Sequence, residues 1–160
     1  MRKSLAALTI FALAVLCLAG CGEEQATNDT SGSKLTRQKV EEFTESAVEY
    51  AKKNGKEKAL AVFSDPKGAY KKGELYVYAY DFDGKVIAHG GDQTLIGKNL
   101  MEYRDPNGFP VIQALRKKAK EGGGWVEYTW QNPETKKQQR KLGYVLEVDD
   151  GWFLGSGMYE

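Results

Sequence analysis

Apolar residues recur with a helical period near the start of the chain and predict a helix at residues 35–54. Four of them lie at intervals of three and four and form one apolar stripe: Val40, Phe43, Ala47 and Ala51. Ser33 or Thr36 can cap the start of this helix, and Asn54-Gly55 is a typical helix end. A shorter helix is predicted at 57–63, where Ser-Asp-Pro follows and ends it.

A period of two replaces the helical period at residues 74–81 and predicts a strand with two different faces. Aliphatic residues on one face alternate with tyrosines on the other: Leu75, Val77 and Ala79 against Tyr76, Tyr78 and Tyr80. The sequence Asp-Phe-Asp-Gly at 81–84 is a hairpin signal, so residues 85–89 are expected to return as an antiparallel strand. The stretch from 90 to 107 is predicted as a loop with one helical turn at 98–103.

The last third of the chain predicts one helix followed by three strands. The helix at 108–121 carries three inward apolar residues: Val111, Ile112 and Leu115. Asp105 or Asn107 is its expected cap, and three glycines at 122–124 end it. A hairpin is predicted at 122–148 and a final strand at 152–159. Strands joined by short turns are antiparallel, so the fold class is α+β with an antiparallel sheet.

Aromatic and basic residues on these strands are candidates for a binding site. Tyr128 and Trp130 share a face of the hairpin, Lys141 follows without an acidic partner nearby in sequence, and His89 is the chain's single histidine. Glycines on a pocket face would leave room for a ligand: Gly143, Gly155 and Gly157. Spacing alone does not match the faces of different strands, because one bulge inverts a face. Ordinary core packing, a structural histidine and an exposed lysine stay open as the alternative.

The first twenty residues form a basic start and a short apolar run, which is typical of a signal peptide. Their end, Leu-Ala-Gly-Cys at 18–21, resembles the lipobox of bacterial lipoproteins and implies lipidation of Cys21. Plain secretion or an uncleaved anchor is the alternative. Residues 21–33 contain no large apolar side chain and are predicted to be a flexible tether.

Composition excludes several classes of function. Removing Arg2 and Lys3 with the signal peptide leaves 21 basic and 22 acidic of the chain's 23 and 22, which is no basic field for nucleic acid. The only cysteines are Cys17, which leaves with the signal peptide, and Cys21. A cysteine nucleophile, a disulfide and a histidine-rich metal site are therefore not expected, and neither is any cofactor.

Six motifs, taken in order, resemble the single Cache domains of the second type, a PAS-like family of extracytoplasmic sensors. They are YVYAYDFDGKVIAHG at 76–90, LIGKNL at 95–100, DPNG at 105–108, GGGWVEYTWQNP at 122–133, KLGYV at 141–145 and GWFLGSGMY at 151–159. Gly90 stands where that family usually has proline. The resemblance implies a domain at 34–160: a five-stranded antiparallel sheet with a long N-terminal helix on one face and a ligand pocket on the other.

The resemblance also implies a small-molecule ligand, commonly a short carboxylate, which needs charge-assisted hydrogen bonds when it leaves water. Lys141 would supply the cation and His89 a donor. Hydroxyl donors would come from three tyrosines: Tyr78, Tyr80 and Tyr128. Trp130 and Trp125 would wall the apolar end, whereas Tyr144 faces the other way and belongs to the core.

Together these features predict a non-catalytic binding protein of the sensor type, lipid-anchored in the cell membrane or the outer membrane and facing the periplasm or exterior. The given sequence ends directly after the last strand, so a signal is expected to pass to a partner membrane receptor or histidine kinase. An enzyme is not expected. The alternative function is a structural or envelope-interaction lipoprotein with a non-functional pocket.

Overall fold

The computed structural model describes residues 35–160, so the predicted signal peptide, the tether and the lipidation of Cys21 lie outside the described residues. The elements of the described part are α1 (Arg37–Asn54), α2 (Lys56–Phe63), β1 (Lys71–Lys72), β2 (Leu75–Tyr76), β3 (Tyr78–Asp81), β4 (Val86–His89), the 3-10 helix η1 (Gln93–Leu95), α3 (Val111–Lys120), β5 (Gly124–Gln131), β6 (Gln138–Asp149) and β7 (Trp152–Tyr159). Five strands form one antiparallel sheet in the order β4-β3-β7-β6-β5, and β1 pairs with β2. The predicted α+β class and sheet are confirmed.

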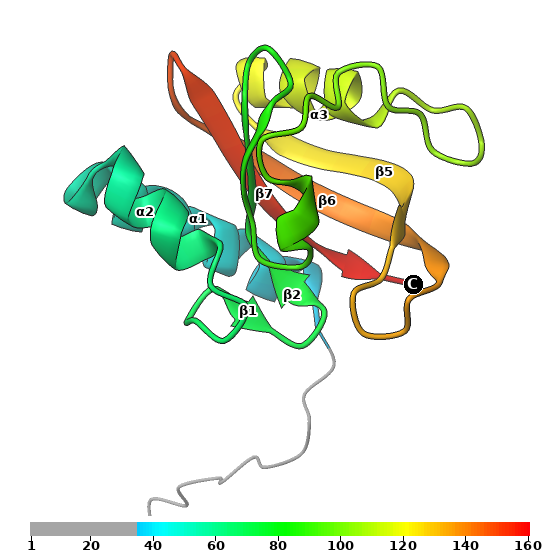
Figure 1. Cartoon of the computed structure of the whole chain (residues 1–160), viewed down its shortest axis with the longest axis horizontal. Helices are drawn as coiled ribbons and strands as arrows, with labels where there is room; N and C mark the ends of the chain where they lie inside the picture. The colour runs from blue at the N-terminus through cyan, green and yellow to red at the C-terminus, as the bar shows by residue number, and fades with distance from the viewer. Residues whose placement is uncertain (1–34) are drawn as a thin grey trace, which may run out of the picture. The chain divides into compact units, whose positions relative to one another are not determined.

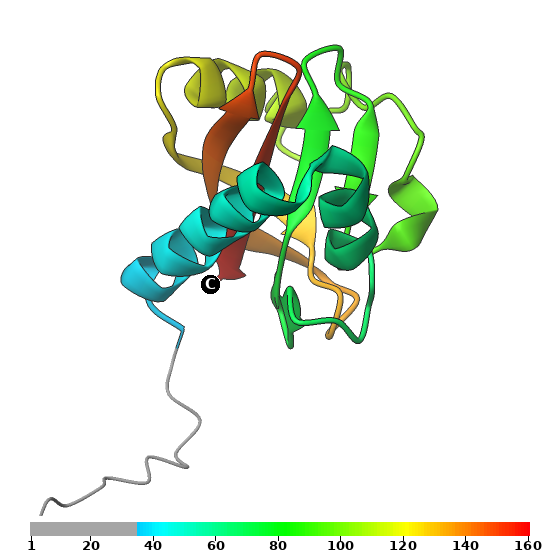
Figure 2. The same ribbon diagram turned by 90° about the vertical axis from the view of Figure 1, so that its left-hand side faces the viewer.

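Two hydrophobic cores lie on opposite faces of this sheet. Figures 1 and 2 show α1 and α2 on one side, and α3 with the long loop after β4 on the other. The α1 side packs aliphatic strand residues such as Val77 and Ala79 against Ala47 and Phe63 of the helices. The α3 side packs the tyrosines of β2 and β3 against the apolar stripe of α3. The alternation predicted at 74–81 therefore sorts its residues onto the correct faces.

The ends of α1 follow the predicted caps. Thr36 accepts a hydrogen bond from the backbone N–H of Lys39 at 3.3 Å, as expected of an N-cap residue. Gly55 follows the helix with φ +84°, which a residue with a Cβ rarely adopts. Between these ends, Val40, Ala47 and Ala51 are buried, so the spacing predicted the packed face of the helix.

The structure differs from the local predictions at three places before α3. The helical turn expected at 98–103 is absent, and η1 forms earlier instead. Residues 71–72, where no strand was expected, pair with β2. The strand predicted at 74–81 is interrupted at Val77, whose N–H donates to Tyr70 O.

The helix predicted from residue 108 begins only at Val111, after Pro110, and has no side-chain cap. Asp105 holds the preceding turn instead, since its Oδ1 accepts from the N–H groups of Asn107 and Phe109, both at 2.9 Å. Its Oδ2 accepts from Thr129 N of β5 at 2.9 Å. A side chain that satisfies this turn is not available to cap the helix that follows.

The register of the sheet decides which residues share the α3 side. Lys141 of β6 lies opposite Tyr128 of β5 and opposite Tyr159 of β7. Since directly paired residues point to the same face, these three side chains form one row. Register shifts occur in the β3–β4 and β6–β7 pairs, whereas the β5–β6 pair is regular.

Candidate ligand-binding site

Lys141 occupies the middle of the tyrosine-rich face and is 1% exposed. Its Nζ donates to the Tyr76 hydroxyl at 2.8 Å. It also lies 4.0, 4.8 and 5.2 Å from the ring centroids of Tyr76, Tyr159 and Tyr78. Aromatic faces attract a cation, so β6 places this lysine in an aromatic box rather than in solvent.

This box gives Lys141 no carboxylate partner. Within residues 35–160, no ion pair includes its Nζ. Loss of hydration lowers the pKa of Lys141 well below its ordinary value, and the more distant Glu74 opposes this only in part. The site therefore contains a basic group whose charged form lacks a neighbouring anion.

A directed chain of hydrogen bonds leads from Lys141 to the end of β5. The Tyr159 hydroxyl donates to Gln131 O at 3.1 Å, so it must accept from the Tyr76 hydroxyl, which lies 3.0 Å away. Tyr76 in turn accepts from Lys141. Each hydroxyl has one proton, so the direction of the chain is determined.

His89, at the end of β4, is buried and neutral. Its Nδ1 accepts from Asp92 N at 2.8 Å, which leaves the proton of the neutral ring on Nε2. Burial and the nearby Lys141 lower the pKa of His89 to about 3. The ring lies 5.0 Å from Tyr76 and is stacked at 6.4 Å from Trp130. His89 can therefore donate one hydrogen bond through Nε2.

Tyr78, Tyr80 and Tyr128 are buried around the same point. The Tyr128 hydroxyl donates to Tyr78 at 3.4 Å, and Tyr78 donates to Ser156 O at 3.4 Å. Burial raises the pKa of all three phenols above its ordinary value, so they are neutral donors. The strands thus bring together the predicted lysine, histidine and three tyrosines, with Trp130 beside them.

The gap between these side chains is narrow. It is closed on the α3 side by three apolar residues, Val111, Ile112 and Leu115, and has no room for a water molecule. The space beside the glycines that were expected to leave room for a ligand is occupied by protein atoms. A Cβ on Gly143 would lie 2.7 Å from the Tyr78 hydroxyl, and one on Gly157 would lie 2.8 Å from Lys141 Cε.

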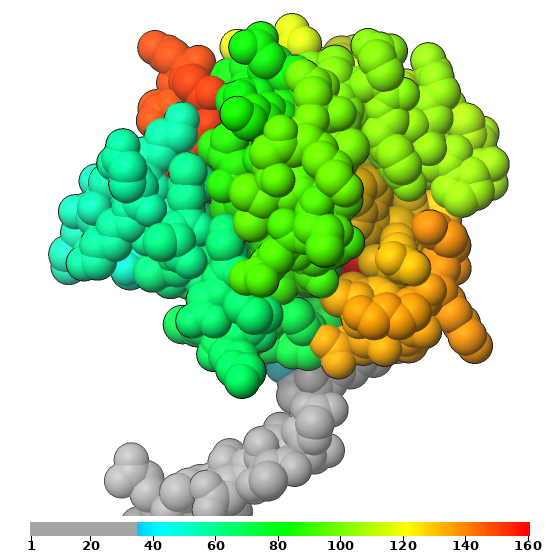
Figure 3. Space-filling view, viewed as in Figure 1, coloured from blue at the N-terminus to red at the C-terminus, as the bar shows by residue number. Residues whose placement is uncertain are grey.

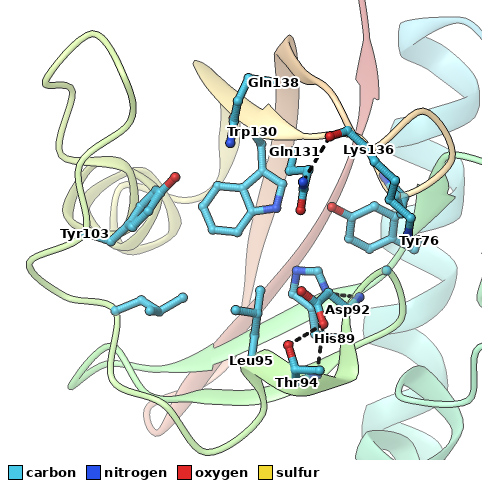
Figure 4. A pocket seen from close by; sticks show the side chains of 13 residues that line it. Tyr76, His89, Asp92, Thr94, Leu95, Tyr103, Trp130, Gln131, Lys136 and Gln138 are labelled. Carbon is cyan, nitrogen blue, oxygen red and sulfur yellow. Dashed lines mark hydrogen bonds between the residues drawn. The ribbon is translucent and has the colours of Figure 1, made fainter.

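An open pocket of about 370 Å³ adjoins this gap, and Tyr76, His89 and Trp130 line both. Figure 3 shows the hollow between the segment after β4, in green, and the β5–β6 turn, in orange. The labelled pocket residues in Figure 4 surround a common space into which the rings of Tyr76, His89 and Trp130 point. The volume suits a small organic molecule.

Several pocket residues were missed by the sequence reasoning. Leu95, Leu100 and Tyr103 come from the loop after β4, Gln131 from the end of β5 and Lys136 from the β5–β6 turn. The Tyr103 ring meets Trp130 edge-on with centroids 5.0 Å apart. Apolar residues within a predicted loop were the available signal, because a loop that buries such residues must cover a core or a cavity.

Trp125 does not line the gap or the pocket, which corrects the expectation that it walls the apolar end. Its Nε1 donates to Glu41 of α1 at 2.7 Å, and its ring lies 5.2 Å from that of Tyr144. An odd spacing from Tyr128 puts it on the opposite face of β5. Tyr144 lies on this α1 side, as predicted.

In residues 35–160, no helix combines the length and the apolar composition needed to cross a bilayer. The same part of the chain has no group of three His, Cys, Asp or Glu side chains placed to hold a metal ion.

A five-stranded antiparallel sheet, with a long helix on one face and a polar cavity on the other, defines the class of PAS-like sensor domains. Residues 32–160 match the model of the family described as Single Cache domain 2. The chain belongs to this family.

Two curated relatives match half of the chain. The sensor histidine kinase MctS of Rhizobium johnstonii is 39% identical over 85 residues, which are 52% of this chain and 18% of the relative. The methyl-accepting chemotaxis protein McpP of Pseudomonas putida is 33% identical over 86 residues, 52% of this chain and 16% of the relative. The chain thus matches less than a fifth of the length of either relative.

Solved structures match more of the chain. A methyl-accepting chemotaxis protein from Vibrio parahaemolyticus aligns with a TM-score of 0.68 and 26% identity, over 76% of this chain and 86% of that one. A structure reported as the basis for carboxylic acid recognition by a Cache chemosensory domain aligns with a TM-score of 0.59 and 25% identity, over 76% and 86%.

Proposed function

We propose that this protein is an extracytoplasmic, non-catalytic binding protein of the sensor type, and that its ligand is a short organic acid. Lys141 is the observation that carries this proposal, because it is buried among tyrosine rings without an ion pair within residues 35–160. A buried cation is stabilised by an anion that brings hydrogen-bond acceptors. A carboxylate supplies both.

The pocket supplies the remaining contacts for such a ligand. A carboxylate between Tyr76 and His89 would accept a hydrogen bond from the His89 Nε2–H. It would also lie against the Tyr76 hydroxyl, which is 2.8 Å from Lys141 Nζ. Its carbon chain would lie against Trp130 and Leu95 in the open pocket. The similar Cache domain whose structure concerns carboxylic acid recognition supports this ligand class.

The proposal includes a lipid anchor on Cys21 and a separate signalling partner, a membrane receptor or histidine kinase. The lipobox-like sequence at 18–21 supports the anchor, and the relatives named as a kinase and a chemotaxis protein support the class of partner. Metabolic labelling of expressing bacteria with an alkyne-bearing palmitate tests the anchor. Label on the wild type and none on Cys21→Ser would support it, and equal label on both would refute it.

Ligand binding is tested by thermal shift and calorimetry with acetate, propionate, butyrate and succinate. A ligand that binds only the folded state raises its melting temperature. We expect a shift with at least one acid, none with matched amines, and none in Lys141→Met. Arg140→Met removes the exposed neighbouring base and should keep the shift. A wild-type protein that responds to none of these acids would overturn the proposal.

A structural or envelope-interaction lipoprotein is the second candidate function. The observation in its favour is the narrow inner gap, which has no room for water. This candidate predicts that Lys141→Met leaves envelope integrity and all partner contacts unchanged. It also predicts that no small acid alters the melting temperature, which the same thermal-shift series decides.

A further inference from the structure

Every strand around Lys141 contributes a polar group that faces it, and none of these groups is a carboxylate. They are Tyr76 from β2, Tyr78 from β3, His89 from β4, Tyr128 from β5 and Tyr159 from β7. The helix α3 adds apolar side chains only. Glu74, just before β2, acts on Lys141 from a distance and accepts from Asn132 Nδ2 at 3.2 Å. The charge of a protonated Lys141 is therefore not neutralised by any group that touches it.

A buried ammonium without a neighbouring anion favours loss of its proton, because the neutral amine needs much less hydration. The geometry permits this loss. A neutral amine still has two protons, so it can donate to the Tyr76 hydroxyl 2.8 Å away, and the chain through Tyr159 stays intact. The direction of the pKa shift at Lys141 agrees with this expectation.

The other groups in the box do not exchange protons near neutral pH. The pKa of His89 is lowered to about 3, so the imidazole is neutral in this range. Burial raises the pKa values of Tyr76, Tyr78 and Tyr128, which stay protonated. Asp92, at the pocket rim, has a lowered pKa and stays ionised. Lys141 is thus the group in this box that can change its charge when a ligand arrives.

We propose that a carboxylate enters this site together with one proton, which Lys141 takes up to form an ion pair with the bound anion. This inference rests on the proposed function. An anion against the Tyr76 hydroxyl would lie within roughly 4–6 Å of Nζ, the range in which an opposite charge favours the protonated form. The protein then senses the acid as an anion and a proton, so its response depends on pH as well as on concentration.

The sign of the pH dependence follows from the uptake of a proton. The unliganded lysine has the lower affinity for the proton and the liganded lysine the higher, so acidification favours binding. Where one proton is taken up per ligand, the association constant falls about tenfold for each pH unit of alkalinisation. Carboxylate binding without proton uptake would be independent of pH from 6 to 9, since short acids are ionised throughout.

Calorimetry of propionate binding tests this inference directly. Titrations at each pH from 6 to 9 are repeated in phosphate and in Tris, whose ionisation enthalpies differ, and the difference gives the number of protons taken up. We expect about one proton and a tenfold loss of affinity per pH unit in the range where the free lysine is neutral. Binding with no proton uptake and constant affinity would overturn the inference and leave the proposed function intact. Absence of binding by all four acids would instead overturn the proposed function.

Variants assign the proton to Lys141. Lys141→Arg keeps a cation that does not deprotonate, so any binding it retains should occur without proton uptake. Lys137→Met removes an exposed lysine of the β5–β6 turn that does not line the pocket, and it should keep the uptake of one proton. If Lys141→Arg binds propionate and still takes up a proton, Lys141 is not the acceptor.

A direct titration covers the case in which the arginine does not fit the buried site. Lysine labelled with 13C at Cε gives a signal for Lys141 that Lys141→Met identifies by its disappearance. We expect this signal in the free wild-type protein to titrate well below the other lysines. Titration together with the exposed lysines would overturn the inference whether or not propionate binds.

Discussion

Replacing Lys141 with methionine should stabilise the unliganded domain. Methionine has a similar length and no charge, and Lys141 is 1% exposed in a box without a carboxylate. Burying the native lysine there costs free energy, because its charged group is better solvated by water. A substitution that removes this cost should increase the free energy of unfolding, although it removes the residue that we propose binds the ligand.

The size of the effect is bounded by the chemistry of the lysine. Removing the proton of a lysine costs about 1.4 kcal/mol for each unit by which the pH lies below its ordinary pKa, which is about 5 kcal/mol at pH 7. Since a buried lysine can become neutral at this cost, the penalty for burying its charge is limited to about 5 kcal/mol. Against this stands the loss of one hydrogen bond to Tyr76 and of the ring contacts, together about 1–3 kcal/mol. Tyr76 keeps Tyr159 as a partner. At the upper limit of the burial penalty, a net gain of about 2–4 kcal/mol remains.

Urea denaturation at pH 7 measures this gain, with both proteins refolded from urea and dialysed to remove bound acids. The midpoint should move to higher urea at unchanged slope. Arg140→Met is the matched control, because Arg140 is exposed and pairs with Glu127 and Glu160 at the surface. It should change stability by less than about 1 kcal/mol. A Lys141→Met protein that unfolds at lower urea than wild type would refute the reasoning.

Three other changes test single contacts. The pKa of His89 is about 3 in the folded protein and about 6.5 when the residue is unfolded, so the unfolded protein takes up the proton first as pH falls. Between pH 7 and pH 4 this residue should therefore lower the free energy of unfolding by about 3 kcal/mol. Urea titrations at both pH values should show no such loss in His89→Gln. Gly143→Ala places a Cβ 2.7 Å from the Tyr78 hydroxyl and 2.9 Å from that of Tyr128, so it should destabilise the domain by about 1–3 kcal/mol and weaken acid binding in calorimetry. Asp105→Ala leaves three backbone N–H groups without their acceptor and should lower stability by about 2–4 kcal/mol in urea, with Asn107→Ala as a milder control.

Much of the fold was predictable because its signals are local. Alternation at 74–81 separates the two faces of a strand, and the intervals between Val40, Ala47 and Ala51 mark the packed side of α1. The start of α3 was not predictable in this way. Asp105 is equally suited to cap a helix or to hold a turn, and its contact with Thr129 of β5 depends on the completed fold.

The candidate site was also predictable only where its signals are local. The residue types of the box were predictable, but their meeting depends on register: Lys141 faces Tyr128 and Tyr159 because β6 pairs with β5 and β7 without a shift at that point. The open pocket was not predictable, since it exists only because the loop carrying Leu95 and Tyr103 lies opposite the β5–β6 turn. The position of Trp125, in contrast, was predictable, because its odd spacing from Tyr128 puts it on the opposite face of β5.

The polar groups of the box favour one charge of ligand over the other. The His89 Nε2–H has no partner among residues 35–160, and Lys141 has at least one N–H beyond the one it donates to Tyr76. The protons of the Tyr76, Tyr78 and Tyr128 hydroxyls are donated to protein atoms. A carboxylate has acceptors only, so each of its oxygens would meet a donor. An amine would add donors to this excess and leave them unsatisfied, at about 1–3 kcal/mol for each buried group. On the proposed function, these two donors favour an acid over an amine, and a lysine that releases its proton would avoid a buried, unpaired charge in the empty box.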